Sequence, residues 1–322
     1  MKRIGVLTSG GDCSGMNACI RAVVRKAVYE GIGVVGIRRG FAGLMEGDSC
    51  PLNAHSVSGI IYQGGTILGT ARAESFLAEE GQRKASDTVR KLGIEGLIVI
   101  GGDGSFRGAY NLNKKWQIPT TGIPATIDND IAGSDLTIGF VTALNTALEA
   151  IDKLRDTATA HNRLFIVEVM GRTSGYIALW AGLAGGAEEI LIPEIKTDLD
   201  EVCRKLEEGR TRGKTSSIIV VAEGDEAGGA FEIGEKIREK IGYEVRVAVL
   251  GHLQRGGSPT VLDRILATRL GADAVDVLKR GDGGKMVGLI ANQVEIFPLE
   301  HAWREKKEID LDLYQLSQIM AI

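Results

Sequence analysis

The stretch from Pro124 to Asp135 holds three aspartates and no basic residue. The carboxylates of Asp128, Asp130 and Asp135 repel one another unless something neutralises them. Such a group could belong to a helix cap, a turn, a cation site, or an acid–base site whose substrate brings the countercharge. Because the stretch follows a predicted buried strand, one carboxylate could accept a hydroxyl proton while another orders metal-bound water. Asp135 is expected only to fix a turn.

Two glycine-rich turns have the form of anion-binding loops. The segment 5–18, GVLTSGGDCSGMNA, joins a strand to a helix through Gly10 and Gly11, which would let backbone amides approach an anion. It matches neither the GxGxxG dinucleotide fingerprint nor the GK[ST] end of a P-loop. The segment 100–109, IGGDGSFRGA, repeats the pattern, and its Asp103 is typical of a carboxylate that holds Mg²⁺ in nucleotide enzymes. The alternative is a plain tight turn, with Asp103 as a helix N-cap.

Basic residues follow other predicted strands. Arg72 lies in a loop of small residues, and GHLQRGG sets His252 and Arg255 three residues apart beside two glycines. Such groups suit the phosphate monoester of a substrate. Singly, each is more often a surface arginine or a buried histidine, but five basic groups beside three carboxylates are harder to explain in that way. The five are Arg163, Arg172, Arg246, His252 and Arg255.

The elements that must position these residues alternate between strands and helices. The predicted strands are residues 3–9, 33–37, 96–102, 119–124, 164–170, 189–193, 217–223 and 245–252. The predicted helices are residues 15–31, 85–93, 139–161 and 200–210. Several strands are unbroken apolar runs, which is typical of parallel strands buried on both faces. The alternation predicts an α/β fold with mainly parallel sheets.

Composition narrows the class of protein. A length of 322 residues suggests two domains of roughly 150 residues. The net charge of −4 argues against a nucleic-acid partner, which would favour a basic face. No apolar run is long enough to span a membrane, and the N-terminus does not resemble a signal peptide. The four cysteines, without CxxC spacing, favour a reduced, cytoplasmic setting.

Together the motifs resemble those of the bacterial ATP-dependent 6-phosphofructokinases, in order and over essentially the whole chain. They are TSGGDCSGMNA, GGTILGTAR, GGDGS, PATIDNDI, TIGFVTALNTALEAID, EVMGR, LAGGAE, VAEG and VLGHLQRGGSP. The resemblance implies transfer of the γ-phosphoryl group of MgATP to the 1-hydroxyl of fructose 6-phosphate by a homotetramer. It also implies two Rossmann-like lobes, a larger ATP-binding lobe (1–139 plus 251–301) and a smaller substrate-binding lobe (140–250 plus 302–322).

The resemblance further implies a role for each site residue. ATP would bind Gly11, Arg72, Ala73, Gly102, Asp103, Gly104 and Ser105, with Asp103 serving Mg²⁺. Asp128 would be the general base, Thr126 would contact the same hydroxyl, and Arg172 would stabilise charge on the transferred phosphoryl group. The remaining substrate-binding residues would be Ile127, Met170, Gly171, Glu223 at the sugar hydroxyls, and Arg163, Arg246, His252, Leu253, Gln254 and Arg255 around the 6-phosphate. In the family, Arg163 and Arg246 reach across from a neighbouring subunit.

An effector site for ADP or phosphoenolpyruvate is implied between subunits. Its residues would be Arg21, Ala22, Val23, Val24, Arg25, Arg155, Gly186, Ala187, Glu188, Arg212, Lys214, Thr215 and Ser216. Any single charge among them could instead be a solvated helix charge. The family commonly carries a further basic residue and an acid in the segment 54–59, where this chain has Ala54 and Gly59. Effector binding is therefore expected to be weaker or altered.

Two positions separate ATP from pyrophosphate as the phosphoryl donor. Pyrophosphate-dependent phosphofructokinases, the alternative function, carry Asp where this chain has Gly104 and Lys where it has Ala125. Both residues favour ATP. Ala125 departs from the usual Gly, which matters only if the backbone there needs a positive φ, and Ser14 replaces a Pro. An NAD-dependent oxidoreductase would need a GxGxxG turn. A sensor without turnover would lack Asp103, Asp128 or Arg172.

Overall fold

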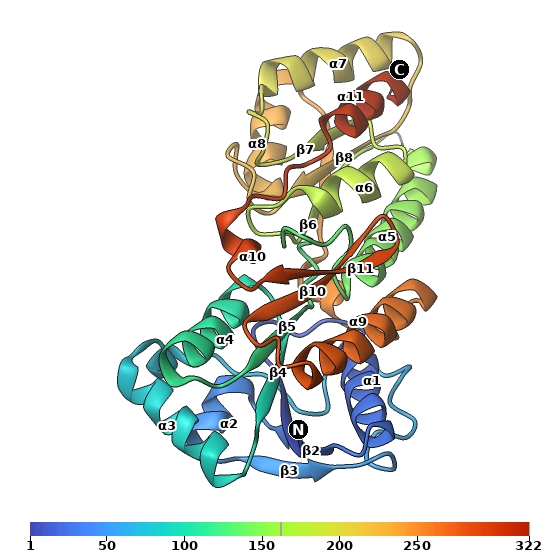
Figure 1. Cartoon of the computed structure of the whole chain (residues 1–322). Helices are drawn as coiled ribbons and strands as arrows, with labels where there is room; N and C mark the ends of the chain where they lie inside the picture. The colour runs from blue at the N-terminus through green and yellow to red at the C-terminus, as the bar shows by residue number, and fades with distance from the viewer. Residues whose placement is uncertain (162, 322) are drawn as a thin grey trace. The chain divides into compact units, whose positions relative to one another are not determined.

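The computed structural model describes residues 1–161 and 163–321 (Figure 1). It divides into two units, the first comprising Met1–Thr126, Ile131–Thr142 and Arg255–Lys307, and the second comprising Ile127–Asp130, Ala143–Gln254 and Glu308–Ile322. The expected larger lobe included residues 127–130. The structure assigns them to the second unit because Asp128 contacts residues of the loop after β6.

The first unit is built on a seven-stranded sheet with the order β11-β10-β5-β4-β1-β2-β3. Its strands are β1 (Arg3–Thr8), β2 (Gly33–Ile37), β3 (Ser49–Leu52), β4 (Gly96–Gly101), β5 (Thr120–Pro124), β10 (Lys285–Ile290) and β11 (Gln293–Pro298). The five inner strands are parallel, whereas β3 and β11 pair antiparallel at the edges. The predicted bounds of β1, β2, β4 and β5 are correct to within one residue. The sequence analysis missed β3, β10 and β11; the two edge strands lack unbroken apolar runs, because most of their residues are exposed or only partly buried.

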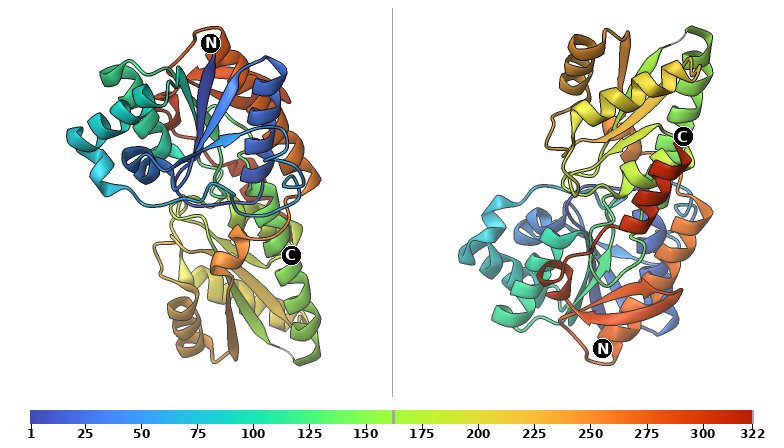
Figure 2. Two further views of the ribbon diagram at one scale, coloured as in Figure 1. Left: turned by 90° about the horizontal axis from the view of Figure 1, so that it is seen from below. Right: turned by 90° about the horizontal axis from the view of Figure 1, so that it is seen from above.

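Helices cover both faces of this sheet (Figures 1 and 2). They are α1 (Met16–Tyr29), α2 (Gly40–Glu46), α3 (Glu79–Lys91), α4 (Asp103–Trp116), α9 (Val261–Lys279) and α10 (His301–Arg304), with a 3₁₀ turn at Glu74–Leu77. Helices α1 and α9 lie together on one face, with α2, α3 and α4 on the other. The packing of α1 on α9 is close because a Cβ at Gly271 would lie 2.8 Å from the Cβ of Ala22.

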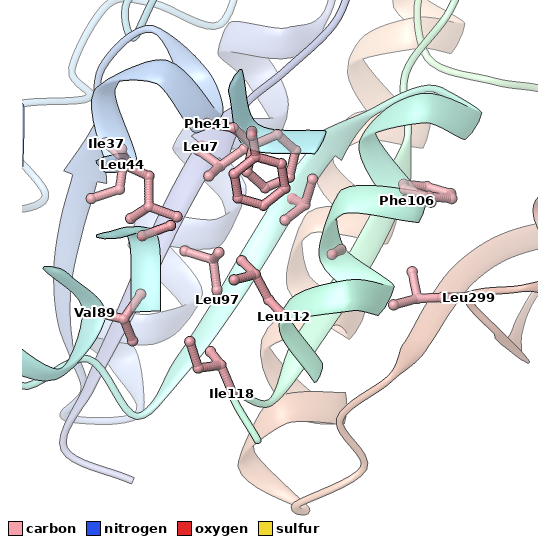
Figure 3. Packing of buried hydrophobic residues seen from close by; sticks show 14 of the residues in the cluster. Leu7, Ile37, Phe41, Leu44, Val89, Leu97, Phe106, Leu112, Ile118 and Leu299 are labelled. Carbon is pink, nitrogen blue, oxygen red and sulfur yellow. The ribbon is translucent and has the colours of Figure 1, made fainter. Parts of the chain in front are cut away.

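The core of the first unit fills the space between the sheet and α2, α3 and α4 (Figure 3). Leu112 of α4 lies beside the sheet residue Leu97 in Figure 3, whereas Phe106 of the same helix packs at β5, where a Cβ at Gly122 would lie 2.7 Å from its Cε1. Phe41 and Phe76 stack with ring centroids 4.2 Å apart. This packing fixes α4, whose first residue is Asp103.

The second unit has a four-stranded, wholly parallel sheet with the order β7-β8-β6-β9. Its strands are β6 (Leu164–Val169), β7 (Glu189–Leu191), β8 (Ser217–Ala222) and β9 (Val245–Val249), and its helices are α5 (Phe140–His161, which begins in the first unit), α6 (Tyr176–Ala184), α7 (Leu199–Thr211), α8 (Ala230–Ile241) and α11 (Leu311–Met320). Ile219 and Val221 of β8 pack in one cluster with residues of α7 and α8. Two mainly parallel sheets flanked by helices confirm the predicted α/β class. In the described part of the chain, no helix has the length and apolarity needed to cross a bilayer.

Predicted helices and strands differ from the observed ones mainly at their ends. Helix α3 begins six residues before the predicted start, because Glu79 and Glu80 favour a helix N-terminus although they are not apolar. Strand β9 ends at Val249 and not at residue 252, since Gly251–Arg255 forms a 3₁₀ turn.

Asp263, which the sequence analysis did not single out, is buried where α9 meets the start of α5. Its carboxylate accepts hydrogen bonds from the amides of Gly139 and Thr142, each at 2.8 Å, and from the Thr142 hydroxyl at 2.5 Å. Thr260 caps α9 by accepting from the Asp263 amide at 3.3 Å. Burial raises the pKa of Asp263, and these hydrogen bonds oppose that rise. Asp263 therefore ties α9 to the start of α5.

Replacing Asp263 with Ala should lower the free energy of unfolding by about 2–3 kcal/mol, because two buried amides lose their acceptor. Chemical denaturation measures the change. Asp276→Ala is the control, since it removes a carboxylate of the same helix that only makes a partly exposed ion pair with Lys26, and should cost less than about 1 kcal/mol. Equal effects of the two substitutions would contradict the role given to Asp263.

Candidate active site

Three turns that follow the neighbouring strands β1, β4 and β5 lie against one another. The amide of Ser9 donates to the carbonyl of Ile100 at 2.9 Å. A Cβ at Gly101 would lie 2.4 Å from the Ser9 carbonyl oxygen, and one at Gly102 would lie 3.8 Å from the Cβ of Thr126. Because parallel strands end at the same edge of a sheet, the predicted glycine turns and Thr126 come together there.

The second glycine turn forms the N-terminus of α4. Gly102 is the N-cap, and Asp103 is the first helical residue, paired with Arg107 at 3.8 Å across one helical turn. Gly104 is exposed, with nothing within 4 Å of an added Cβ, and the buried Ser105 places its Oγ beside the first glycine turn. The helix dipole and the amides that open α4 make this end of the helix suited to a phosphate group.

Asp103 fits a magnesium ion that arrives with a nucleotide. Within residues 1–161 and 163–321, no group of three or more acidic, histidine or cysteine side chains could form a metal site of its own. Mg²⁺ is commonly held by one or two carboxylates together with substrate phosphates. A half-exposed carboxylate beside helix N-terminal amides meets that requirement.

The segment that carries Arg72 starts beside the end of β1. The Thr8 hydroxyl donates to the carbonyl of Gly69 at 2.9 Å, and the Arg39 amide donates to the carbonyl of Leu68 at 2.8 Å. Arg72 itself is exposed, whereas Ala73 packs partly into the core. The sequence analysis identified Arg72 but not the contacts that hold its segment at this edge.

Asp128 is the buried member of the acidic stretch, with a side chain only 9% exposed. Its carboxylate lies 3.7 Å from Nε of Arg172, and its backbone carbonyl accepts the hydroxyl proton of Ser174 at 2.8 Å. Arg172 thus supplies Asp128 with a countercharge within the chain, besides any that a substrate would bring. Asp135 is structural as expected, because its carboxylate accepts the amide of Ala291 at 2.7 Å.

The turn from Met170 to Arg172 is held by acceptors on two other loops. Gln254 accepts the amide of Met170 at 2.8 Å, and Glu223 accepts the amide of Arg172 at 2.8 Å. Arg172 has a left-handed backbone with φ of 54°, and a Cβ at Gly224 would lie 1.7 Å from its carbonyl oxygen. Glu223, expected at the sugar hydroxyls, thus also fixes the backbone of Arg172. Strained conformations of this kind persist only where neighbouring contacts enforce them.

Two of the predicted phosphate-binding arginines lie near each other on neighbouring strands. Arg246 is a residue of β9, and Arg163 directly precedes β6, the strand with which β9 pairs. Both pair with Glu244, the Nε of Arg163 at 3.6 Å and Arg246 more closely. His252 and Leu253 are exposed on the 3₁₀ turn. Arg255 belongs to the first unit, as the expected larger lobe has it, and a Cβ at Gly11 would lie 2.5 Å from its Nη1.

The predicted effector residues of the second unit gather around Glu188. Arg155 donates to the carbonyls of Gly185 and Gly186 at 2.7 and 2.6 Å and lies 3.8 Å from Glu188. Lys214 lies 3.9 Å from Glu188 and donates to a carbonyl of the C-terminal segment. A cavity of about 210 Å³ is lined by Glu188, Arg212 and Lys214, among others, and one of about 380 Å³ by Lys214, Thr215, Ser216 and Arg163. Ala187 is buried.

The remaining predicted effector residues lie on α1. Arg25 is exposed, and burial lowers the pKa of Arg21, with the charge of Arg25 lowering it further. The side chains of Ala22, Val23 and Val24 are buried in the core. The exposed surface of this run is therefore offered mainly by Arg21 and Arg25.

Sequence reasoning missed residues whose partners are backbone groups of distant loops. Ser14 donates to carbonyls near Gly256, Asn17 donates to the carbonyl of Gly64 at 3.0 Å, and the buried Cys13 thiol donates to the carbonyl of Ile138. No spacing rule reveals such contacts. For Asp263 a signal existed, the pattern TVLD before an apolar helix. Ala125 has no left-handed backbone, so its methyl group is tolerated.

Comparison with known proteins assigns the chain a family. A family model described as Phosphofructokinase matches residues 3–278. The chain is 56% identical over 322 residues to "ATP-dependent 6-phosphofructokinase" of Halalkalibacterium halodurans, covering 100% of both chains. It is 56% identical, again over 100% of both, to "ATP-dependent 6-phosphofructokinase 1" of Thermus thermophilus.

Solved structures give the same fold. Phosphofructokinase from Saccharomyces cerevisiae superposes with a TM-score of 0.88 at 34% identity, covering 94% of this chain and 45% of the yeast chain, so this chain spans under half of that protein. A pyrophosphate-dependent phosphofructokinase from Marinobacter aquaeolei superposes with a TM-score of 0.85 over 97% of this chain and 86% of that chain. At 23% identity, the second likeness concerns the fold alone.

Replacing Glu223 with Ala should expose the amide of Arg172 to solvent exchange. Loss of a hydrogen bond to a charged acceptor should speed its exchange about tenfold. Hydrogen–deuterium exchange of peptides covering residues 170–174 measures the change. Glu226→Ala, on the same loop, should leave these peptides unaffected. If Glu223→Ala also leaves them unaffected, Glu223 does not fix the turn.

Proposed function

This chain belongs to the phosphofructokinase family, and on that premise we propose that it is an ATP-dependent 6-phosphofructokinase. It transfers the γ-phosphoryl group of MgATP to the 1-hydroxyl of fructose 6-phosphate and yields fructose 1,6-bisphosphate and ADP, a step of glycolysis. The observation that carries the proposal is 56% identity, over the full length of both chains, to relatives with that name. A coupled assay with fructose 6-phosphate and either ATP or pyrophosphate tests it.

We propose that residues of the first unit bind the nucleotide. The amides of Gly11 and of the α4 N-terminus from Gly102 to Ser105 would bind phosphate oxygens, with Arg72 as a further cation. Asp103 would hold Mg²⁺ when it arrives with ATP, and the ion would neutralise charge on the phosphates. The contact of these turns at one sheet edge supports the assignment.

We propose that residues of the second unit, together with Thr126, act on the sugar phosphate. Asp128 would accept the proton of the 1-hydroxyl, and Thr126 and Ile127, which directly precede it in the chain, would contact the sugar. Arg172 would stabilise negative charge on the transferred group. The 3.7 Å ion pair between Arg172 and Asp128 supports their joint role. A weak base suffices if proton transfer lags behind a loose phosphoryl transition state, because catalysis then rests on positioning and electrostatics.

The 6-phosphate is proposed to bind Arg163, Arg246 and His252. Since Glu244 pairs with both arginines, a phosphate must displace it from them. In the family the two arginines serve a neighbouring subunit, so we infer a homotetramer. Apolar side chains at the start of α9 support an oligomer, since Val261, Leu262 and Ile265 are 70%, 57% and 52% exposed.

ADP and phosphoenolpyruvate are the proposed effectors. The cluster of Arg155, Arg212 and Lys214 around Glu188 offers cations for an anionic ligand. Because this chain has Ala54 and Gly59, it lacks a basic and an acidic group that the family commonly carries in the segment 54–59. We therefore expect weaker or altered inhibition by phosphoenolpyruvate. A titration with phosphoenolpyruvate tests this. The proposed reaction and the reduced cysteines support a cytoplasmic location.

Replacing Asp128 with Ser should lower kcat by about 10²–10⁴-fold and change the KM for fructose 6-phosphate far less, because proton acceptance matters most in the transition state. Steady-state kinetics measure both constants. Asp135→Asn is the matched control within the same acidic stretch and should retain normal turnover. Unchanged turnover of Asp128→Ser would remove Asp128 from the role of base.

Replacing Gly104 with Asp should raise the KM for ATP by at least about tenfold, because the added carboxylate repels the nucleotide phosphates. The control Gly104→Ala adds a methyl group to the same open position and should retain ATP use. Kinetics with ATP and with pyrophosphate compare both variants with the wild type. Turnover of the wild type with pyrophosphate but not ATP would favour the pyrophosphate-dependent alternative.

A further inference from the structure

One buried hydroxyl joins the turn that carries Arg172 to the loop that carries Asp128. Ser174 lies two residues after Arg172 and is only 6% exposed, whereas Arg172 and Thr173 are exposed. The Ser174 hydroxyl donates to the backbone carbonyl of Asp128 at 2.8 Å. This hydrogen bond therefore connects the two segments whose side chains form the ion pair of Asp128 and Arg172.

The backbone on either side of Ser174 is itself held in place. The amide of Ser174 donates to the carbonyl of Gly171 at 2.9 Å and closes the turn around Arg172. The next amide, that of Gly175, donates to the carboxylate of Glu194, whose two oxygens lie at 2.9 and 3.1 Å. The hydroxyl of Ser174 thus comes from a backbone that is fixed before it and after it.

Each of the two joined segments contains a left-handed residue beside the ion pair. Arg172 has a φ of 54°, and Asn129, which directly follows Asp128, has a φ of 53°. This conformation is uncommon for residues other than glycine and persists only where neighbouring contacts enforce it. The carbonyl that accepts from Ser174 belongs to the peptide group between Asp128 and Asn129. The hydrogen bond therefore acts directly on the strained backbone beside Asp128.

The contact of Ser174 differs from that of Glu223. Glu223 accepts the amides of Gly171 and Arg172, at 3.3 and 2.8 Å, and so holds the turn itself. Those bonds do not involve the loop of Asp128. The bond of Ser174 spans both segments, so loss of its hydroxyl would change the placement of one reactive group relative to the other.

We propose that Ser174 is a positioning residue that holds the carboxylate of Asp128 in place relative to the guanidinium of Arg172. The proposal rests on the proposed function and deepens it, since these two groups are the proposed base and the proposed stabiliser of the transferred phosphoryl group. Ser174 acts through the backbone of Asp128 and does not contact the substrate. A small shift of a reacting group lowers turnover, whereas substrate binding changes less.

Steady-state kinetics of Ser174→Ala test the proposal. The kcat should fall about fivefold, as expected for the loss of one hydrogen bond of ordinary strength. The KM for fructose 6-phosphate should change by less than about twofold. The control Ser317→Ala removes a hydroxyl of the same unit that is also buried, at 3% exposed, and donates to the carbonyl of Tyr314 at 2.6 Å. It should leave both constants unchanged. A normal kcat in Ser174→Ala would overturn the proposal.

The double variant Ser174→Ala/Asp128→Ser distinguishes positioning of Asp128 from an effect elsewhere in the unit. Its kcat should equal that of Asp128→Ser, because no carboxylate is left for Ser174 to position. A further loss of about fivefold on top of the loss in Asp128→Ser would show that Ser174 acts through another group. That result would overturn the proposal.

Hydrogen–deuterium exchange measures the same contact without turnover. Ser174→Ala should speed exchange in peptides covering residues 127–131, whereas Ser317→Ala should leave these peptides unaffected. Unchanged exchange in Ser174→Ala would contradict the role given to the hydroxyl. The measurement stays valid if the wild type shows no kinase activity with fructose 6-phosphate and ATP, a result that would count against the proposed function.

Thermal unfolding checks that each variant is folded. If Ser174→Ala does not fold, Ser174→Cys takes its place, because a thiol has a similar shape but is only a weak donor. Its kcat should then lie below that of the wild type, and exchange in residues 127–131 should be faster. Wild-type values of both in a folded Ser174→Cys variant would overturn the proposal.

Discussion

The close contact between the turns after β1 and β4 is the constraint on which the proposed nucleotide site depends. A single Cβ at Gly101 would lie 2.4 Å from the Ser9 carbonyl, so any side chain there would separate the turns. Their separation would move the start of α4 away from the end of β1, and with it the amides that both turns present. The glycines thus set the distance between the two backbone segments that are proposed to bind phosphate.

In the second unit, hydrogen bonds from polar side chains hold the backbone of the loops in place. Glu223 and Gln254 accept amides of the turn 170–172, and Ser174 donates to the carbonyl of Asp128. Arg172 keeps its left-handed conformation under these contacts. A surrounding set of polar side chains therefore places the proposed catalytic residues Asp128 and Arg172, and loss of those side chains would displace both.

The sequence predicted the parallel strands well, because burial on both faces requires unbroken apolar runs that are easily seen. It also predicted that the glycine turns and the stretch after β5 would lie at one sheet edge, and the structure brings Gly102, Thr126 and the turn containing Gly11 together. It did not predict the pairing of Asp128 with Arg172, since that contact joins loops far apart in the chain. Sequence motifs identify which side chains could be functional, whereas contacts between loops far apart in the chain determine which residues lie next to those side chains.

The cysteine inside the first glycine turn has a chemical consequence of its own. The Cys13 thiol is buried, it donates to the Ile138 carbonyl, and burial raises its pKa. The thiolate is the form that oxidants and alkylating reagents attack, and both low pKa and access favour it. Cys13 lacks both. The turn can therefore contain sulfur next to its anion-binding amides and still be insensitive to peroxide or thiol reagents.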